Sequence, residues 1–299
     1  MANHALLIRL APLLFVLLWS TGFVAAKYSM WNADPFVFLC LRFSLTTLAL
    51  VLIIMLTGGS LPRSIWQHRH DMVTGVLLQC CYLGFVFWPI KNGVPSGIVA
   101  IIVGLQPLLT LALAAIFIGE SLSLRKVGGL ILGFIGVTIV IIGKFGIDLG
   151  LDGGLSTFSL VLCILSLLGI ATGVFYQKKF CNQSQLLTGT MMQYVAATIA
   201  TALFAFVSGE SWQINWTPGF ALALSWQVFG LSIGAVVLLM AIIKAGEAGK
   251  VSSMFYLVPP LVVIEAHFLF GETLGFISIL GMGLCIFGVY LVNRRIATT

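Results

Sequence analysis

Ten apolar runs, joined by short connections, dominate the sequence. An α-helix needs about 20 predominantly apolar residues to cross the hydrocarbon core of a bilayer. The runs are continuous rather than alternating, which favours helices over the strands of a membrane barrel. They lie at residues 10–29, 36–56, 72–90, 97–118, 126–143, 156–176, 186–207, 219–243, 251–270 and 274–292. The sequence therefore predicts an all-α membrane protein with ten transmembrane helices.

Charged residues are too scarce to cover a water-facing surface. Only 8% of the 299 residues are charged, whereas a soluble domain carries roughly 25%. The net charge of +6 comes from Lys and Arg residues scattered singly or in pairs, so no basic stripe for nucleic acid exists. We therefore expect the lipid bilayer and a small-molecule solute as partners, and no nucleic acid.

The basic residues are divided unevenly between the two sides of the predicted bundle. With ten spans, eleven of the fifteen fall on one side and three (Lys27, Lys91 and Lys144) on the other, while Arg42 lies within a span. Cytoplasmic loops carry the excess of Lys and Arg in membrane proteins. We therefore predict a multi-pass protein of the cell inner (cytoplasmic) membrane, with both termini cytoplasmic.

The chain also contains an internal repeat. A shift of 152 residues places 97–141 over 249–293 without a gap, and 14 of the 45 positions are identical. Gly119-Glu120-Ser121-Leu122 meets Gly271-Glu272-Thr273-Leu274. The glycine suits a helix end and the following Ser or Thr suits a cap on the next helix. We predict two repeats of five helices, residues 1–147 and 148–299. Because five is odd, they are inverted relative to each other, as in many transporters whose site lies between the halves.

Prolines interrupt two corresponding runs. Pro107 lies midway along the fourth run, and Pro259 and Pro260 lie midway along the ninth. A proline inside a helix removes one backbone hydrogen bond and displaces the carbonyl four residues earlier. In a membrane this is tolerated only where the freed group is buried in protein or lines a cavity. The three prolines therefore predict kinks or hinges beside a binding site, with a kink that only shapes packing as the alternative.

The first-span stretch Leu18–Lys27, the Arg42-Phe43 pair and the two Gly-Glu turns resemble the drug/metabolite transporter (DMT) superfamily, EamA-type family. The resemblance covers essentially the whole chain. It implies ten helices in two inverted repeats and export or exchange of small metabolites, such as amino acids, their derivatives or nucleobase-like compounds. Gln177 and Gln193 stand where the second half would repeat Lys27 and Arg42, so any charged site is one-sided. Whether the protein forms a homodimer stays open.

Four ionisable residues lie inside the predicted spans: Lys27, Arg42, Glu265 and His267. Placing an ionisable side chain inside the bilayer costs free energy, and such residues usually have a function. All four are expected in the outer half, Arg42 roughly 10 Å deep at 1.5 Å per residue. One interpretation pairs Arg42 with Glu265 and lets Lys27 reach the headgroups. In a second, Arg42 or Lys27 holds a solute carboxylate and Glu265 an ammonium. In a third, Glu265 or His267 carries a proton.

A second set of candidates is polar or aromatic, and a cavity with such walls suits a small, partly apolar solute. Helix packing is the alternative for each residue singly, and it is the simpler interpretation of the glycines at 128, 129, 133 and 136. Gln227 in the eighth run belongs to this set. The candidate substrate-binding residues are Trp19, Lys27, Arg42, Gln79, Tyr82, Gln106, Gln193, Tyr256 and Glu265.

Other functional classes lack their signatures in this sequence. No H-E-x-x-H motif and no serine with a histidine base appears in a span, so we expect no enzyme, no catalytic residue, no metal and no cofactor. No phosphate-binding loop is present, so ATP does not drive the chain directly. A channel would need a ring of charge or a filter-like loop. A non-transporting membrane receptor or scaffold stays open as an alternative.

Overall fold

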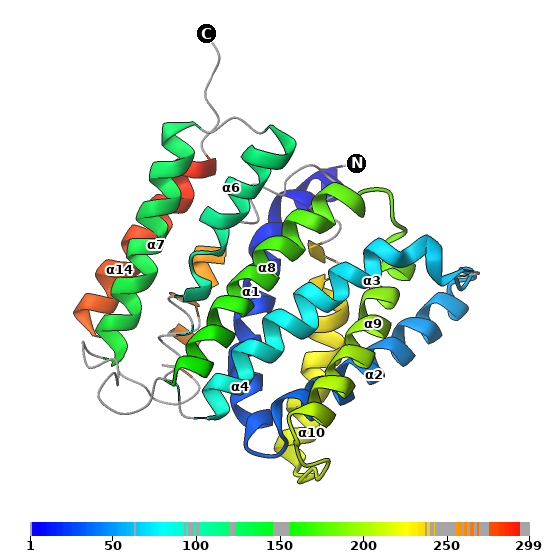
Figure 1. The fold of residues 1–299 in the computed structure, drawn as a ribbon. Helices are drawn as coiled ribbons and strands as arrows, with labels where there is room; N and C mark the ends of the chain where they lie inside the picture. Colours follow the sequence, from blue (N-terminus) through cyan, green and yellow to red (C-terminus); the bar gives the residue numbers. More distant parts are fainter. Residues whose placement is uncertain are drawn as a thin grey trace.

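The computed structural model describes residues 2–62, 64–92, 94, 99, 102–119, 123–145, 156–236, 238–239, 242, 255–258, 260–261, 264–265, 268 and 275–293. Within these residues the protein is helical and contains no strand (Figure 1). The first half holds α1 (Ala2–Met30), α2 (Pro35–Leu56), η1 (Ile65–His68), α3 (Arg69–Gly75), η2 (Val76–Gly84), α4 (Phe85–Lys91), α6 (Gln106–Ile118) and α7 (Leu124–Phe145). The second holds α8 (Thr157–Phe180), α9 (Leu186–Val207), α10 (Pro218–Ser225), η3 (Trp226–Ala235), η4 (Phe255–Leu257) and α14 (Phe276–Asn293).

Five helical stretches in the described part are long and apolar enough to cross a membrane. They are Pro35–Leu56, Ile65–Lys91, Thr157–Phe180, Leu186–Val207 and Pro218–Ala235. Shorter apolar helices cover Ala11–Gly22, Gln106–Ile118 and Phe276–Val292. An all-helical protein with several candidate spans agrees with the predicted class. The count of ten stays a prediction.

Helices from the two halves of the chain interleave. Helix α7 lies along α14 at one edge of the molecule, and α2 packs on α9 away from that edge (Figure 1). Helix α1 packs on η3, and η2 packs on α8. In the two repeats, α1 corresponds to α8, η2 to η3, α2 to α9 and α7 to α14. The α1–η3 contact is therefore the counterpart of the α8–η2 contact, whereas α2–α9 and α7–α14 are each contacts between two corresponding helices. This is the contact pattern expected of an inverted repeat. The predicted boundary between residues 147 and 148 lies outside the described residues.

Glycines let α7 and α14 approach each other closely. A Cβ added to Gly136 would lie 2.7 Å from the backbone nitrogen of Cys285. One added to Gly288 would lie 2.6 Å from the carbonyl oxygen of Gly129. The close helix packing predicted for this run is therefore confirmed at positions 129 and 136. Close packing is not found at Gly128, where an added Cβ would meet no described atom within 4 Å.

The turn after α6 is built partly as predicted. Gly119 ends the helix in the left-handed region, with a φ of 74°, and its N–H donates to the carbonyl of Ala115 at 3.2 Å. The predicted cap, Ser121, lies outside the described residues. Helix α7 begins at Leu124, and the N–H of Lys126 donates to Ser123 Oγ at 3.2 Å. The second copy of the turn, residues 271–274, lies outside the described residues.

The fourth run is broken just before Pro107 rather than kinked at it. Residues 102–103 are helical, a turn follows at 104–105, and α6 then starts at Gln106 with Pro107 in its first turn. A proline there removes no helical hydrogen bond, because first-turn N–H groups have no partner within the helix. In the ninth run η4, a 3-10 helix, occupies the corresponding place, directly before the prolines. Pro260 is buried, and Pro259 lies outside the described residues.

Two π-helical stretches, which the sequence did not predict, occupy equivalent places in the two halves. The stretch η2 lies within the third run and η3 within the eighth. A π-helix is rare and is frequently found at functional sites. These two stretches carry side chains that line the cavities described next.

Candidate functional site

A cavity of about 40 Å³ lies between α1, α2, η2, α4 and η3. We call it the arginine cavity, because Arg42 is the only charged residue among the described residues that line it. Its walls are otherwise aromatic and aliphatic, with one amide. The lining residues are Trp19, Gly22, Arg42, Tyr82, Leu83, Val86, Phe87, Gln227 and Leu231.

The Arg42 side chain is buried, with 6% of its surface exposed. Its Nε donates to Ser232 Oγ at 2.9 Å and its Nη1 donates to Gln227 Oε1 at 3.0 Å. Gln227 in turn donates through Nε2 to Ser29 Oγ at 3.0 Å. Within the described part of the chain every hydrogen-bond partner of the guanidinium is neutral. A buried positive charge without an acidic partner is costly, so the cavity favours an anionic group.

A second cavity, of about 20 Å³, lies between α1, η2, α8, α9 and the helix that follows η3. We call it the amide cavity, because three buried glutamines line it. Trp19 and Tyr82 line both cavities, so they lie where the two spaces meet. The lining residues are Trp19, Leu78, Gln79, Tyr82, Ile170, Val174, Gln177, Gln193, Val236 and Leu239.

The structure brings five predicted binding residues together at these cavities. Arg42 lines the arginine cavity, Gln79 and Gln193 line the amide cavity, and Trp19 and Tyr82 line both. These residues lie more than 170 positions apart at the extremes of the sequence, so only tertiary packing assembles the set.

Two other predicted residues line neither cavity. Gln106 donates through Nε2 to Thr110 Oγ1 at 2.9 Å, within its own helix. Tyr256 is buried against Gly133, where an added Cβ would meet its ring. The side chain of Lys27 and the whole of His267 lie outside the described residues.

The interpretation that pairs Arg42 with Glu265 is wrong, since the structure gives the two side chains different partners. Glu265 Oε1 accepts a hydrogen bond from Ser20 Oγ, beside Trp19 on α1. Its other carboxylate oxygen is buried and has no hydrogen-bond partner in the described part of the protein. Glu265 therefore links the ninth run to α1 and keeps one acceptor that no described residue uses.

Nothing in the sequence singled out Ser29 and Ser232, and Gln177 was predicted only as the residue that replaces a lysine. Each is a small or neutral polar residue inside an apolar run, a signal too common to single out a site. Ser232 and Ser29 become informative only because they surround Arg42 and Gln227. Gln177 becomes informative because it faces a cavity.

Polar contacts between the halves close one end of the bundle at the 31–34 and 208–217 loops. Glu210 Oε2 accepts from the N–H groups of Phe36 and Val37, at 2.8 and 3.0 Å, in the first turn of α2. Asp34 Oδ2 accepts from the N–H of Ser211 at 3.0 Å. We call this group the loop-208 clamp. Burial raises the pKa of the Glu210 carboxyl above its usual range.

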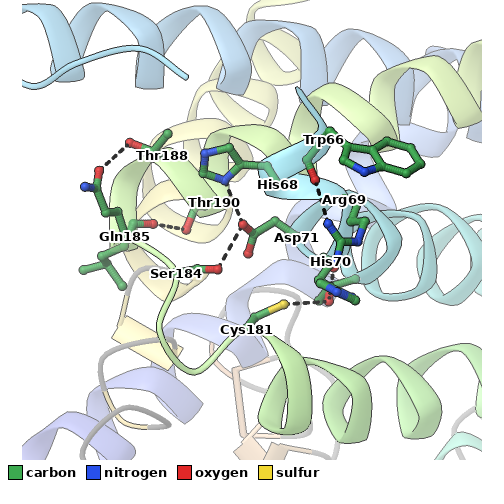
Figure 2. A network of polar contacts seen from close by, with 12 residues as sticks. Trp66, His68, Arg69, His70, Asp71, Cys181, Ser184, Gln185, Thr188 and Thr190 are labelled. Atoms are coloured by element: carbon green, nitrogen blue, oxygen red, sulfur yellow. Dashed lines mark hydrogen bonds and ion pairs between the residues drawn. The ribbon is translucent and has the colours of Figure 1, made fainter. Parts of the chain in front are cut away.

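A corresponding group closes the other end at the 181–185 loop (Figure 2). Asp71, with 1% of its surface exposed, accepts through Oδ2 from Ser184 Oγ at 3.0 Å and contacts His68 Nδ1 at 3.0 Å. Its Oδ1 faces the first turn of α9, 3.1 Å from a Cβ added to Gly189. A carboxylate from one half thus faces a helix N-terminus of the other half at both ends, where negative charge is favoured. We call this second group the loop-181 clamp.

The chain is similar to a known protein family and to a solved structure. The EamA-like transporter family model matches residues 6–142 and 157–294. The uncharacterized transporter YvbV of Bacillus subtilis is 26% identical over 94% of this chain and 89% of its own length. The uncharacterized inner membrane transporter YedA of Escherichia coli is 24% identical over 93% of this chain and 87% of its own.

Two further comparisons bear on activity and architecture. A probable amino-acid metabolite efflux pump of Salmonella typhimurium is 24% identical over 93% of this chain and 92% of its own length. A solved crystal structure, named only as a protein, has a TM-score of 0.77 and covers 96% of this chain and 97% of its own. Its identity is 16%, so the similarity concerns the fold alone.

Proposed function

The chain belongs to the EamA-like transporter family, and we propose that it is a secondary transporter that exports or exchanges amino acids or related small metabolites by alternating access. The efflux pump among its relatives is named for amino-acid metabolites, which supports this class of solute. The relatives named above are transporters rather than enzymes.

Buried Arg42 is the observation that carries the proposal. A guanidinium with neutral partners, beside Trp19 and Tyr82, suits a solute that has a carboxylate and a partly apolar body. At about 40 Å³ the arginine cavity has room for water but not for a metabolite. It must therefore widen during transport, as alternating access requires. Trp19, Gln79, Tyr82 and Gln193 form the remaining wall of the proposed path.

The proposed architecture has ten transmembrane helices in two inverted repeats, residues 1–147 and 148–299. The paired contacts α1–η3 and α8–η2 support it, as do the helix break before Pro107 and the 3-10 helix before Pro260. We place the protein in the inner membrane, as the name of YedA states for that relative. Both termini are proposed to be cytoplasmic, with the loop-208 clamp at the outer face.

Glu265 is proposed to couple transport to protons. Its carboxylate keeps one buried oxygen without a partner among the described residues, and its other oxygen contacts α1 next to Trp19. A proton taken up there would remove a buried negative charge from the ninth run. His267 stays a second candidate on sequence grounds alone.

Flux into proteoliposomes tests the proposal directly. Purified protein is first screened by thermal shift against the standard amino acids and their derivatives, and each hit is then measured as radiolabelled uptake at two pH values. We expect Arg42→Gln to lower uptake about tenfold or more, because a hydrogen bond to a charged group contributes about 1.5–3 kcal/mol. Glu265→Gln should abolish the difference in uptake between the two pH values.

Arg69→Gln is the matched control, because Arg69 lies exposed on α3 and its described contacts are with the nearby Trp66, to whose carbonyl it donates. It should transport like the wild type. Equal uptake by wild type and Arg42→Gln, at matched amounts of folded protein in the vesicles, would rule out the proposed contact with the carboxylate.

A further inference from the structure

Gln177 holds a buried hydrogen-bond acceptor that no described residue of the protein uses. The residue lies near the end of α8, and 2% of its surface is exposed. Its Oε1 is buried and has no hydrogen-bond partner among the described residues, yet the side chain lines the amide cavity. A buried acceptor without a hydrogen bond destabilises the folded protein. An unused acceptor at the edge of a cavity is explained if a ligand supplies the donor.

The two cavities occupy equivalent positions in the repeat. The arginine cavity involves α1 and α2, η2 with the following α4, and η3. The amide cavity involves α8 and α9, the helix that follows η3, and η2, together with Trp19 of α1. Arg42 lies seven residues after Pro35, where α2 begins, and Gln193 lies seven residues after Leu186, where α9 begins. The positions match, but the chemistry differs: one cavity carries a cation and the other only amides.

We propose that the amide cavity is a second binding station for the transported solute, where Gln177 Oε1 accepts a hydrogen bond from an ammonium group. The inference rests on the proposed transport function and narrows its solute to a zwitterion. Arg42 receives the carboxylate in the arginine cavity, and Gln177 receives the ammonium once the solute has passed Trp19 and Tyr82. At about 20 Å³ the amide cavity now holds one water at most, so it too must widen.

Binding at the two cavities can be distinguished with an amino acid and two analogues that each lack one of its charged groups. L-Leucine carries both charges, 4-methylpentanoate lacks the ammonium, and L-leucinamide lacks the carboxylate. Half-saturation of the thermal shift is measured for each compound on wild type, Gln177→Leu and Arg42→Gln. We expect wild type to bind L-leucine about tenfold or more tightly than 4-methylpentanoate, as one hydrogen bond to a charged donor predicts.

Gln177→Leu should remove that preference, so that L-leucine and 4-methylpentanoate bind equally weakly. Without ligand, this variant should melt at the same temperature as the wild type or higher, because it eliminates a buried unpaired acceptor. Lower affinity in a protein of equal or greater stability cannot come from misfolding. Arg42→Gln should instead weaken L-leucine and leave L-leucinamide unchanged.

Ser166→Ala is the matched control. Ser166 lies on α8 and also has a buried oxygen with no partner among the described residues, but it lines neither cavity. It should keep the full preference for L-leucine. The inference is overturned if Gln177→Leu keeps the preference too, or if Ser166→Ala loses it equally. If the wild type responds to other metabolites but to none of these three compounds, the proposal of a zwitterionic solute is wrong and the proposed transport function is unaffected. No response to any metabolite would overturn both.

Discussion

At the scale of single residues, the buried polar groups divide into those satisfied by the protein and those kept for another partner. Gln106 and Thr110 satisfy each other within one helix. Arg42 makes hydrogen bonds but has no charge partner in the described part of the chain. Gln177 and Glu265 each keep an oxygen that no described residue uses. Ser166 also keeps an unpaired buried oxygen among the described residues, but it lines neither cavity. Arg42, Gln177 and Glu265, by contrast, lie at or beside the two cavities. This is where a solute could replace the missing partner.

Glu210 gives a prediction for pH. Because burial raises its pKa in the folded protein, the folded state binds this proton more tightly than the unfolded chain does. Its contribution to stability is therefore full below the ordinary value of 4.5 and is lost as the pH rises through the higher folded value. Melting curves of the purified protein across this range should show that step, and Glu210→Gln should lack it. Asp34 and Lys91, which form a 3.2 Å ion pair, are the charged neighbours to keep intact.

Glu210→Ala should behave differently from Glu210→Gln, because alanine leaves two N–H groups at the start of α2 uncapped. We expect a loss of about 0.5–2 kcal/mol at every pH. Gln213→Ala, an exposed change in the same loop, serves as the control and should melt like the wild type. Identical curves for all three variants would show that the loop-208 clamp contributes nothing to stability.

At the scale of elements, short irregular stretches inside the helices position the site. The π-helical stretches η2 and η3 present Gln79, Tyr82 and Gln227 to the cavities. Gly75, just before η2, lets α3 approach α9 so closely that an added Cβ would overlap the carbonyl oxygen of Gln193. By contrast, α7 and α14 form a regular, tightly packed pair at the edge of the molecule (Figure 1).

Helix α7 offers two glycines with opposite surroundings. Gly136→Val should destabilise the protein by about 1–3 kcal/mol or more, since the new side chain meets the backbone of α14. Gly128→Val should have little effect, because nothing lies within 4 Å of the added Cβ. Thermal unfolding in detergent, followed by size-exclusion chromatography, compares the two. If Gly128→Val is as unstable as Gly136→Val, the destabilisation comes from the replacement of a helix glycine by valine rather than from the packing of α7 on α14.

At the scale of the whole molecule, both ends of the bundle are closed by contacts between the halves. The loop-208 clamp joins Glu210 to α2, and the loop-181 clamp joins Asp71 to Ser184 before α9 (Figure 2). The cavities between the clamps are small. A transporter of this design would release one clamp at a time, and the similar position of the two clamps makes both movements equivalent.

The proposed orientation can be mapped by cysteine labelling. Gln213 and Gln183 are exposed in loops at opposite ends, while five of the six native cysteines are buried. In intact cells, a membrane-impermeant maleimide should label Gln213→Cys at once and Gln183→Cys only after permeabilisation. The reverse pattern would invert the orientation, and labelling of both in intact cells would contradict placement of the two loops on opposite sides.

Much of the architecture follows from the sequence alone, because the length of an apolar run and the residue that ends a helix are local properties. Hydropathy located the helices α2, α8 and α9 within a few residues. The glycine that ends α6 in the left-handed region was predicted at Gly119. The repeat indicated that α7 and α14 are counterparts, and the family match covers both halves.

The site was decided only by the tertiary structure. Arg42 binds residues 185 and 190 positions away, and no periodicity in the sequence distinguishes those neutral partners from the expected Glu265. The cap at Ser123, the break before Pro107 and the two π-helical stretches likewise depend on how neighbouring helices pack. Hydropathy determines which segments leave water, because burial of apolar surface is additive along the chain. Which polar groups then meet depends on the packing of helices against each other, and that is a property of the whole fold.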